Sequence, residues 1–357
     1  MFALVLGEND LVRALGRAGI VSVVVRDADD PIRHSRFVRE VVPRSALLEQ
    51  PRYEGAPLFY DSDAALDYVS GERDRLAALY RFVLPEQALL DDLLDKGRFQ
   101  ALADRAGLPV PRARRVSATD ADADLRFPVI VKASPHRDRR WSEVAGDSKV
   151  LLVDDPRALR DVVARLDGTG VDLIAQELVP GGEDRIESYH VYVDDSGAVV
   201  AEFTGRKIRT APLEFGMTTS LETTDEADVA ELGRTVIERI GFRGVAKLDF
   251  KRAPDGELHL LEINPRFTLW VHAGAAAGVN LPAIVYADLT GRPRPPVGRA
   301  RPGVRWIWPS ADAAAARESG VPLWRWLPWA LRAETNSSFA LTDPAPYIRG
   351  RLSGRRR

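Results

Sequence analysis

The chain contains no cysteine. This absence excludes disulfides, thiolate metal ligands and cysteine nucleophiles, and it argues against an extracellular scaffold held together by disulfides. The sequence also lacks any apolar run of about 18 residues, so it predicts no membrane-spanning helix. Neither sign of charge dominates: 50 lysines and arginines face 52 acidic residues, for a formal net charge of -2. This overall balance gives no reason to expect nucleic acid as a partner.

The first residues of the chain lack the features of a secretory signal. Met1 to Glu8 carry no basic segment, and their apolar run ends at Gly7, so a first β-strand is the better interpretation. Together with the absence of cysteine, this favours a cytoplasmic location. The length of 357 residues is enough for two or three lobes, because single cores stop growing at about 250 to 300 residues.

Hydrophobic periodicity predicts an N-terminal α/β domain over residues 1–92. Apolar runs at 3–6 and 21–25 read as buried strands, and residues 11–18 between them read as a helix. Such a βαβ unit implies a parallel sheet. Helical patterns then dominate to about residue 94.

A second domain is predicted over residues 93–291. It opens with one helical pattern from 93 to 106, and a small lobe of strands and one helix follows at about 127–180. The polar stretch 134–148 reads as a long loop between two strands, and such loops are often functional. Residues 292–357 form an extension with five of the seven tryptophans, in which Pro328 is expected to interrupt any helix.

The segment from Lys247 to Arg266 reads as a β-hairpin around Asp255-Gly256, a dipeptide that favours a tight turn. A two-residue turn pairs Asp249 with Glu262, whereas a three-residue bulged turn would shift this register by one. Directly opposed side chains lie about 5 Å apart, and two like charges there destabilise a sheet unless a cation sits between them.

This pairing predicts a metal site. Asn264, two residues beyond Glu262, shares its face and adds a neutral oxygen. Three hard oxygen ligands suit magnesium better than zinc. The alternative is an exposed hairpin edge with ordinary solvated acids.

Five motifs occur in an order that resembles the ATP-grasp superfamily. They are Asp95-Lys96, Phe127-Pro-Val-Ile-Val-Lys132, Gln176-Glu-Leu-Val-Pro-Gly-Gly182, Gly205-Arg-Lys-Ile-Arg209 and Leu261-Glu-Ile-Asn-Pro-Arg266. Within the superfamily the chain most resembles the carbamoyl-phosphate-synthase-like carboxylate–amine ligases, the branch that includes D-aspartate ligases. The resemblance implies an α/β ATP-grasp fold with an N-terminal Rossmann-like lobe, a small central nucleotide-binding lobe and a C-terminal α+β lobe.

The resemblance also implies which residues bind ATP. Lys96, Lys132 and Lys149 would contact phosphates, although Lys132 closing an apolar strand and Lys96 on a helix can equally extend to solvent. The hinge that contacts adenine through its main chain corresponds to Gln176, Glu177, Leu178 and Val179. Glu183 or Asp184 would accept hydrogen bonds from the ribose, with Glu183 preferred.

For the metal and the chemistry, the resemblance implies that Asp249, Glu262 and Asn264 hold one or two magnesium ions between the β- and γ-phosphates, with manganese as an alternative. Arg266 would stabilise the acyl phosphate and the tetrahedral intermediate. Arg206, Lys207 and Arg209 would help to bind the substrate carboxylate.

The sequence thus predicts an ATP-dependent ligase that joins a small carboxylate, such as an amino acid or peptide-like acid, to an amine. Two alternatives stay open: a ligase with another nucleophile, through thiol or carboxyphosphate chemistry, and a nucleotide-binding protein without turnover. The expected partners are small molecules, with no nucleic acid and no membrane span. A homodimer is left open.

Overall fold

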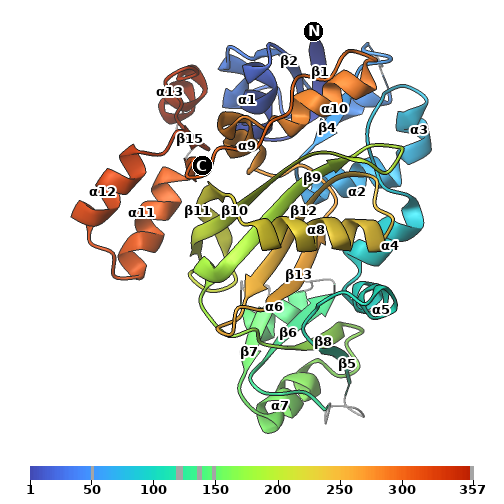
Figure 1. Cartoon of the computed structure of the whole chain (residues 1–357), viewed down its shortest axis with the longest axis vertical. Helices are drawn as coiled ribbons and strands as arrows, with labels where there is room; N and C mark the ends of the chain where they lie inside the picture. Colours follow the sequence, from blue (N-terminus) through green and yellow to red (C-terminus); the bar gives the residue numbers. More distant parts are fainter. Residues whose placement is uncertain (50–51, 118–123, 135–138, 147–149, 354–357) are drawn as a thin grey trace.

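The computed structural model describes residues 1–49, 52–117, 124–134, 139–146 and 150–353. Within these residues the strands form three sheets that follow one another along the long axis of the molecule (Figure 1). A four-stranded sheet lies at the N-terminal end, a seven-stranded sheet in the middle and a second four-stranded sheet at the far end. This arrangement confirms the predicted α/β class with three lobes.

The N-terminal sheet is parallel throughout, in the order β3-β2-β1-β4. Its strands are β1 (Phe2–Leu6), β2 (Val21–Val25), β3 (Val38–Val42) and β4 (Leu58–Tyr60). Around it lie α1 (Asn9–Arg17), α2 (Asp63–Gly71), α3 (Arg73–Ala77), α4 (Gln87–Leu94) and the 3-10 turns η1 (Pro31–His34) and η2 (Arg44–Leu47). The strands predicted at 3–6 and 21–25 are confirmed. Helices do form much of the segment up to residue 94, but β3 and β4 also lie within it and were not expected.

The small lobe holds the third sheet, in the order β5-β8-β6-β7. Its elements are α5 (Lys96–Ala106), β5 (Ala113–Val116), β6 (Val129–Ser134), α6 (Arg139–Ala145), β7 (Val150–Val153), α7 (Pro156–Leu166) and β8 (Asp172–Glu177). The helix expected at 93–106 is two helices. Asp95 leaves the helical conformation between α4 and α5 and accepts a 2.8 Å bond from the Arg98 amide, which caps α5. Helix α6 lies in the stretch expected to be a loop, and its fully buried Trp141 packs into the core of this lobe.

The central sheet has the order β13-β12-β9-β10-β11-β14-β15. Its strands are β9 (Ile186–Val193), β10 (Val199–Ala211), β11 (Met217–Thr224), β12 (Gly244–Arg252), β13 (Leu258–Asn264), β14 (Arg305–Ile307) and β15 (Thr335–Asn336), preceded by the turn η3 (Glu183–Arg185). One face packs on α8 (Ala227–Arg239), where Val229 and Val236 meet Tyr189 and Leu248. The other face packs on α9 (Val271–Ala277) and α10 (Leu281–Leu289), and it turns polar toward β12 and β13.

The C-terminal extension contains α11 (Pro309–Glu318), α12 (Leu323–Leu331) and α13 (Ala345–Leu352), at the left of Figure 1. Helix α12 continues through Pro328, so the expectation that this proline interrupts it is wrong. Tertiary contacts hold the helix: Trp326 Nε1 donates to Asp312 at 2.8 Å, and the Trp329 ring lies beside the guanidinium groups of Arg209 and Arg305. No helix among the described residues is long and apolar enough to cross a membrane.

Candidate active site

The predicted hairpin is formed by β12 and β13, and Asp249 lies opposite Glu262 as expected. The turn nevertheless differs from the prediction. Ala253 and Glu257 close it at 2.8 Å around three residues, and Gly256 adopts the left-handed φ of 95° that favours glycine. This turn shifts the register by one, and a bulge between Asp249 and Phe250 shifts it back. Two departures therefore cancel to give the predicted pair.

Asp249 is the centre of a charged cluster on the polar face of the central sheet. Its carboxylate is only 2% exposed, and it accepts 2.5 Å bonds from Lys247 Nζ and Ser188 Oγ, while Lys207 Nζ lies 3.6 Å away. Burial alone would raise the pKa of Asp249, but the two lysines and the hydrogen bonds outweigh it and hold the pKa below its usual value. The carboxylate is therefore ionised at neutral pH.

Glu262 and Asn264 lie beside this cluster on β13. The Glu262 side chain is exposed, and it accepts a 3.0 Å bond from Asn264 Nδ2. Asp249, Glu262 and Glu183 together raise the pKa of Lys207 against the opposing effect of burial. The charges of the two predicted metal carboxylates therefore both act on Lys207.

Two lysines of the small lobe, Lys96 and Lys132, lie close together at the end of β6. Burial lowers the pKa of Lys132, and the charge of Glu262 opposes that shift, so these two side chains interact across the lobes. Lys132 Nζ donates to Gln176 Oε1 at 2.6 Å, and Lys96 Nζ donates to the Ala133 carbonyl at 2.5 Å. The structure therefore brings Lys96, Lys132 and Gln176 together at the end of β6. Lys149 lies outside the described residues.

The predicted adenine hinge follows the end of β8. Glu177 is buried and held by the Arg126 guanidinium at 2.9 and 3.1 Å, and the Leu178 amide donates to the Pro128 carbonyl at 3.1 Å. These groups are engaged within the small lobe, while Val179 is buried beside them. A main-chain contact to adenine stays a prediction.

The two acids expected to bind ribose differ in their surroundings. Burial raises the pKa of Glu183, and Lys207 and Lys251 act against that shift, so Glu183 faces the charged cluster. Asp184 is exposed on the same turn. The structure is consistent with the preference for Glu183, and the ribose contact itself stays a prediction.

Of the three basic residues on β10, only Lys207 reaches the Asp249 cluster. Arg206 points to the opposite face, as alternation along a strand requires, and pairs with Glu222 at 2.6 Å. A register shift between Lys207 and Arg209 then turns Arg209 toward the C-terminal extension, where it forms 2.9 and 2.7 Å bonds to Asp312. The structure therefore does not bring Arg206 or Arg209 to the cluster: alternation along the strand directs Arg206 away from it, and the bulge turns Arg209 away.

Arg266 connects the hairpin to the N-terminal lobe. Its guanidinium pairs with Asp63 at 2.7 Å, donates to the Asp61 carbonyl at 3.2 Å and approaches Asn264 Oδ1 at 3.4 Å. Arg266 therefore lies beside the predicted metal ligands, at the border of two lobes.

Sequence reasoning missed the acids with which Arg266 meets the N-terminal lobe. Asp61 follows β4, and its Oδ2 accepts a 2.8 Å bond from the Glu8 amide, which follows β1. Burial raises the pKa of Asp61 to about 7. The signal was present: acids directly after strands of a parallel sheet gather at its carboxyl edge, where α/β proteins bind ligands.

Ser188 and His190 on β9 were also missed. They alternate with the buried Tyr189 and Val191, and β9 pairs with β12 so that Ser188 lies opposite Asp249 and His190 opposite Lys247. The His190 ring stacks on Phe203 at 4.4 Å, and burial lowers its pKa well below the usual value. The available signal was that polar residues occupy alternate positions of an otherwise apolar strand.

The donor set fits magnesium held together with phosphates. Carboxylate and amide oxygens are the ligands that magnesium prefers, and it commonly combines one or two carboxylates with phosphate oxygens. In the part of the chain that the structure describes, no group of three or more acidic or histidine side chains could hold a metal by itself. Glu262, Asn264 and Asp249 would therefore need further oxygens from a bound ligand.

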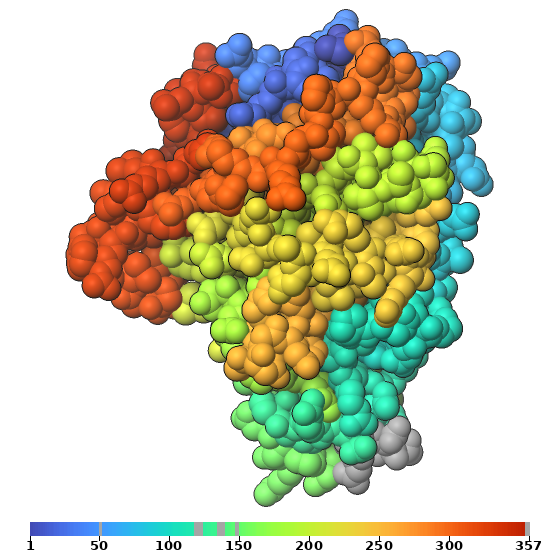
Figure 2. Space-filling view, in the orientation of Figure 1, coloured from blue at the N-terminus to red at the C-terminus, as the bar shows by residue number. Residues whose placement is uncertain are grey.

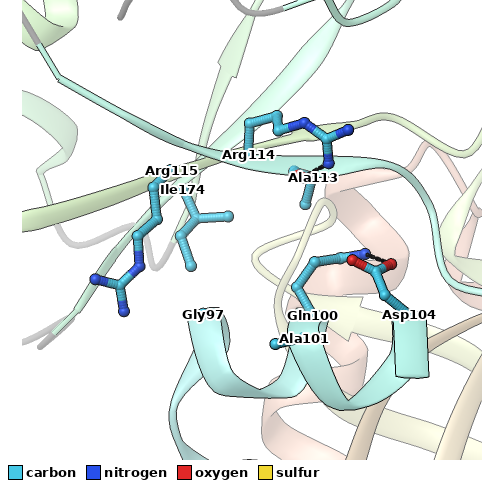
Figure 3. A pocket seen from close by; sticks show the side chains of 8 residues that line it. All are labelled: Gly97, Gln100, Ala101, Asp104, Ala113, Arg114, Arg115 and Ile174. Carbon is cyan, nitrogen blue, oxygen red and sulfur yellow. Dashed lines mark hydrogen bonds between the residues drawn. The ribbon is translucent and has the colours of Figure 1, made fainter. Parts of the chain in front are cut away.

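A separate hollow of about 210 Å³ lies on the small lobe, between α5 and β5 (Figure 3). Gly97 and Gln100 line it from the helix, and Arg115 and Ile174 from the strands. Gln100 bonds Asp104 at 3.0 Å along the helix, as Figure 3 shows. None of the residues of the Asp249 cluster lines this hollow, so it is not part of the candidate site.

Known proteins are similar to this chain in sequence and in fold. A family model described as "ATP-grasp in the biosynthetic pathway with Ter operon" matches residues 192–310. The D-aspartate ligase of Enterococcus faecium is 21% identical over 285 residues, which are 72% of this chain and 68% of that protein. A D-alanine–D-alanine ligase of Alcanivorax borkumensis is 28% identical over 178 residues, 48% of this chain and only 54% of its own length.

Solved structures show the fold. The biotin carboxylase domain of the Hydrogenobacter thermophilus 2-oxoglutarate carboxylase, solved with MgADP, ADP and bicarbonate, aligns with a TM-score of 0.63 at 16% identity, over 85% of this chain and 73% of that one. An L-amino acid ligase from Bacillus licheniformis aligns with a TM-score of 0.57 at 16% identity, over 81% and 73%. The molecule has the ATP-grasp fold. The chain also shows distant homology to D-aspartate and D-alanine–D-alanine ligases.

Proposed function

We propose that this protein is an ATP- and magnesium-dependent ligase that activates a small carboxylate as an acyl phosphate and joins it to an amine through an amide bond. The observation that carries the proposal is the cluster of Lys207 and Lys247 around Asp249, opposite Glu262, whose charge also acts on Lys132 of the small lobe. The distant relationship to D-aspartate ligase supports the same class of reaction.

The charges of the site suit a magnesium nucleotide. The reaction brings two anions together, so its main requirement is positive charge held in place. When bound, ATP supplies the phosphoryl group and magnesium screens its charge. Lys132 and Lys96 would hold phosphate oxygens, and Glu262, Asn264 and Asp249 would hold the metal.

Lys207 and Arg266 are the residues that would orient the substrate carboxylate and stabilise the acyl phosphate. Lys207 lies 3.6 Å from Asp249 and can exchange this partner for a phosphate oxygen. Arg266 offers the planar donors that match a carboxylate or phosphate. Asp61, Asp63 and Glu8 at the carboxyl edge of the N-terminal sheet are suited to an amine, which arrives as an ammonium ion.

The test is phosphate release from ATP with magnesium, across a panel of amino acids and small acids given singly and in pairs. Release that requires one carboxylate and one amine, with an amide product detected by mass spectrometry, is the expected result. Phosphate release with a carboxylate and a thiol, or with bicarbonate, would indicate that the nucleophile is not an amine. ATP binding without release under any pair would favour a protein without turnover.

A further inference from the structure

Helix α12 divides into three sectors. Successive residues of a helix are about 100° apart, so Leu323, Trp324, Leu327 and Leu331 share an arc of about 100°. These four side chains are 67%, 68%, 45% and 76% exposed. Trp326 and Trp329 on the inner side bind Asp312 and contact Arg209, and these contacts hold the helix on the protein. The outer sector is therefore a fixed apolar surface that the described residues leave uncovered.

Two arginines lie between this apolar sector and the inner tryptophans. By the same rotation, Arg332 and Arg325 lie about 80 to 100° beyond Trp324 around the helix, and both are exposed. Among the described residues no carboxylate forms an ion pair with either of them, and Arg325 lies over the Trp324 ring at 4.8 Å. Helices that lie in a lipid interface commonly carry tryptophan and leucine on one face and arginine on the polar face.

The charge of the extension differs in sign from that of the rest of the chain. Residues 292–357 hold 13 arginines, no lysine and four acidic residues. Residues 1–291 hold 37 basic and 48 acidic residues. The near-neutral total thus conceals a strongly basic extension on an acidic body, and basic segments beside an apolar face are attracted to anionic lipids.

We propose that the outer face of α12 binds the surface of an anionic lipid bilayer. Leu323, Trp324, Leu327 and Leu331 would enter the interface, and Arg325 and Arg332 would contact lipid phosphates. Helix α13 lies on the same flank of the molecule (Figure 2) and exposes Ile348 and Leu352 beside Arg349 and Arg351. No spanning helix is required, because the contact lies in the plane of the surface.

A second copy of the chain fits this face less well. In a symmetric dimer the same patch meets itself, so the arginines that border α12 would face arginines. Such like-charge contacts oppose association. An anionic surface instead balances them.

The test is co-sedimentation of the full-length protein with phosphatidylcholine vesicles, with and without phosphatidylglycerol. We expect binding only with phosphatidylglycerol, weakened by added salt. A Trp324→Ser, Leu327→Ser double variant is expected to bind at least about tenfold more weakly. An Arg325→Ser, Arg332→Ser variant is expected to lose the preference for phosphatidylglycerol.

The matched control is Leu152→Ser, which changes an apolar side chain that is 41% exposed on β7 of the small lobe. It is expected to bind vesicles like the unmodified protein. Circular dichroism and urea unfolding check that each variant is folded. The proposal is overturned if no vesicle is bound, or if the Trp324, Leu327 variant binds unchanged. A dimer that this variant converts to monomer, without vesicle binding, would assign the face to a second copy.

Discussion

Asp249 and Asp312 are both buried aspartates bound by cationic side chains, yet their partners differ in kind. Asp249 is held by two lysines and one serine, beside the exposed Glu262. Asp312 is fully buried and accepts bonds from Arg209, Thr219, Ser220 and Trp326. Lysines are single mobile charges that can exchange partners, whereas a two-pronged arginine with hydroxyl and indole donors fixes one geometry. The first arrangement suits a ligand site, and the second suits a structural joint.

The comparison predicts its largest effect on stability when the structural carboxylate, Asp312, is removed. Asp312→Ala leaves the Arg209 guanidinium buried without its partner, and we expect a loss of about 3 to 5 kcal/mol in the free energy of unfolding. Urea unfolding followed by tryptophan fluorescence measures it. A loss below about 1 kcal/mol would show that the extension does not depend on this joint.

Asp61 is another buried aspartate, but in contrast to Asp249 and Asp312 its pKa is raised, so it makes stability depend on pH. Burial raises its pKa from 3.8 to about 7, so between these values the folded state holds more protons than the unfolded state. Its contribution to stability is therefore present below about pH 4 and is lost as pH rises to about 7, by at most about 4 kcal/mol.

The Asp61→Asn variant tests this slope. The difference in unfolding free energy between the unmodified protein and this variant should change across that pH range in urea titrations. A difference that stays constant from pH 4 to pH 8 would contradict the shifted pKa of Asp61.

Removing a proposed metal ligand tests the assignment of the Asp249 cluster as a ligand site. Glu262 is exposed, so Glu262→Gln should change stability little while lowering magnesium-dependent turnover by about 10² to 10³-fold, as loss of a charge-stabilising group does. Asn264→Ala is expected to act in the same direction. Steady-state phosphate release measures both, and near-normal rates in the two variants would exclude the metal assignment.

A smaller effect is expected at the small lobe. Lys132→Met would remove the charged hydrogen bond to phosphate that we propose, so the dissociation constant for ATP should rise about tenfold. Calorimetric titration measures it. Arg206→Ala is the control, because Arg206 pairs with Glu222 on the opposite face of the sheet, and it should change the constant less than about twofold. Equal effects of the two substitutions would show that Lys132 does not bind the nucleotide.

Local chemistry in the sequence predicted the hairpin and its two carboxylates, because the turn dipeptide and the strand period are local signals. It did not predict that a three-residue turn and a bulge cancel, since both depend on how β12 packs against β9 and β13. The bulge in β10 likewise separates Lys207 from Arg209, which the period placed on one face. Strand β11 went unnoticed because its residues, Met217–Thr224, are mostly polar and form a strand through their neighbours.

The acids of the N-terminal lobe likewise show that contacts between distant strands could not be predicted from local sequence. Glu8 and Asp61 are 53 residues apart in sequence and meet only because β1 and β4 are adjacent. Strand order is set by the packing of the whole lobe, so the sequence showed these two acids but not the bond between them. The order of the five motifs along the chain supplied the resemblance to ATP-grasp proteins, which no single local pattern did.

The most direct test of the account is the magnesium dependence of ATP binding in two variants of one hairpin. Glu257→Gln, on the exposed turn, should keep the tighter binding that magnesium confers on the unmodified protein, and Glu262→Gln should lose it. This result would assign the Asp249 cluster to a magnesium nucleotide. Magnesium-dependent binding that is the same in both variants would contradict it.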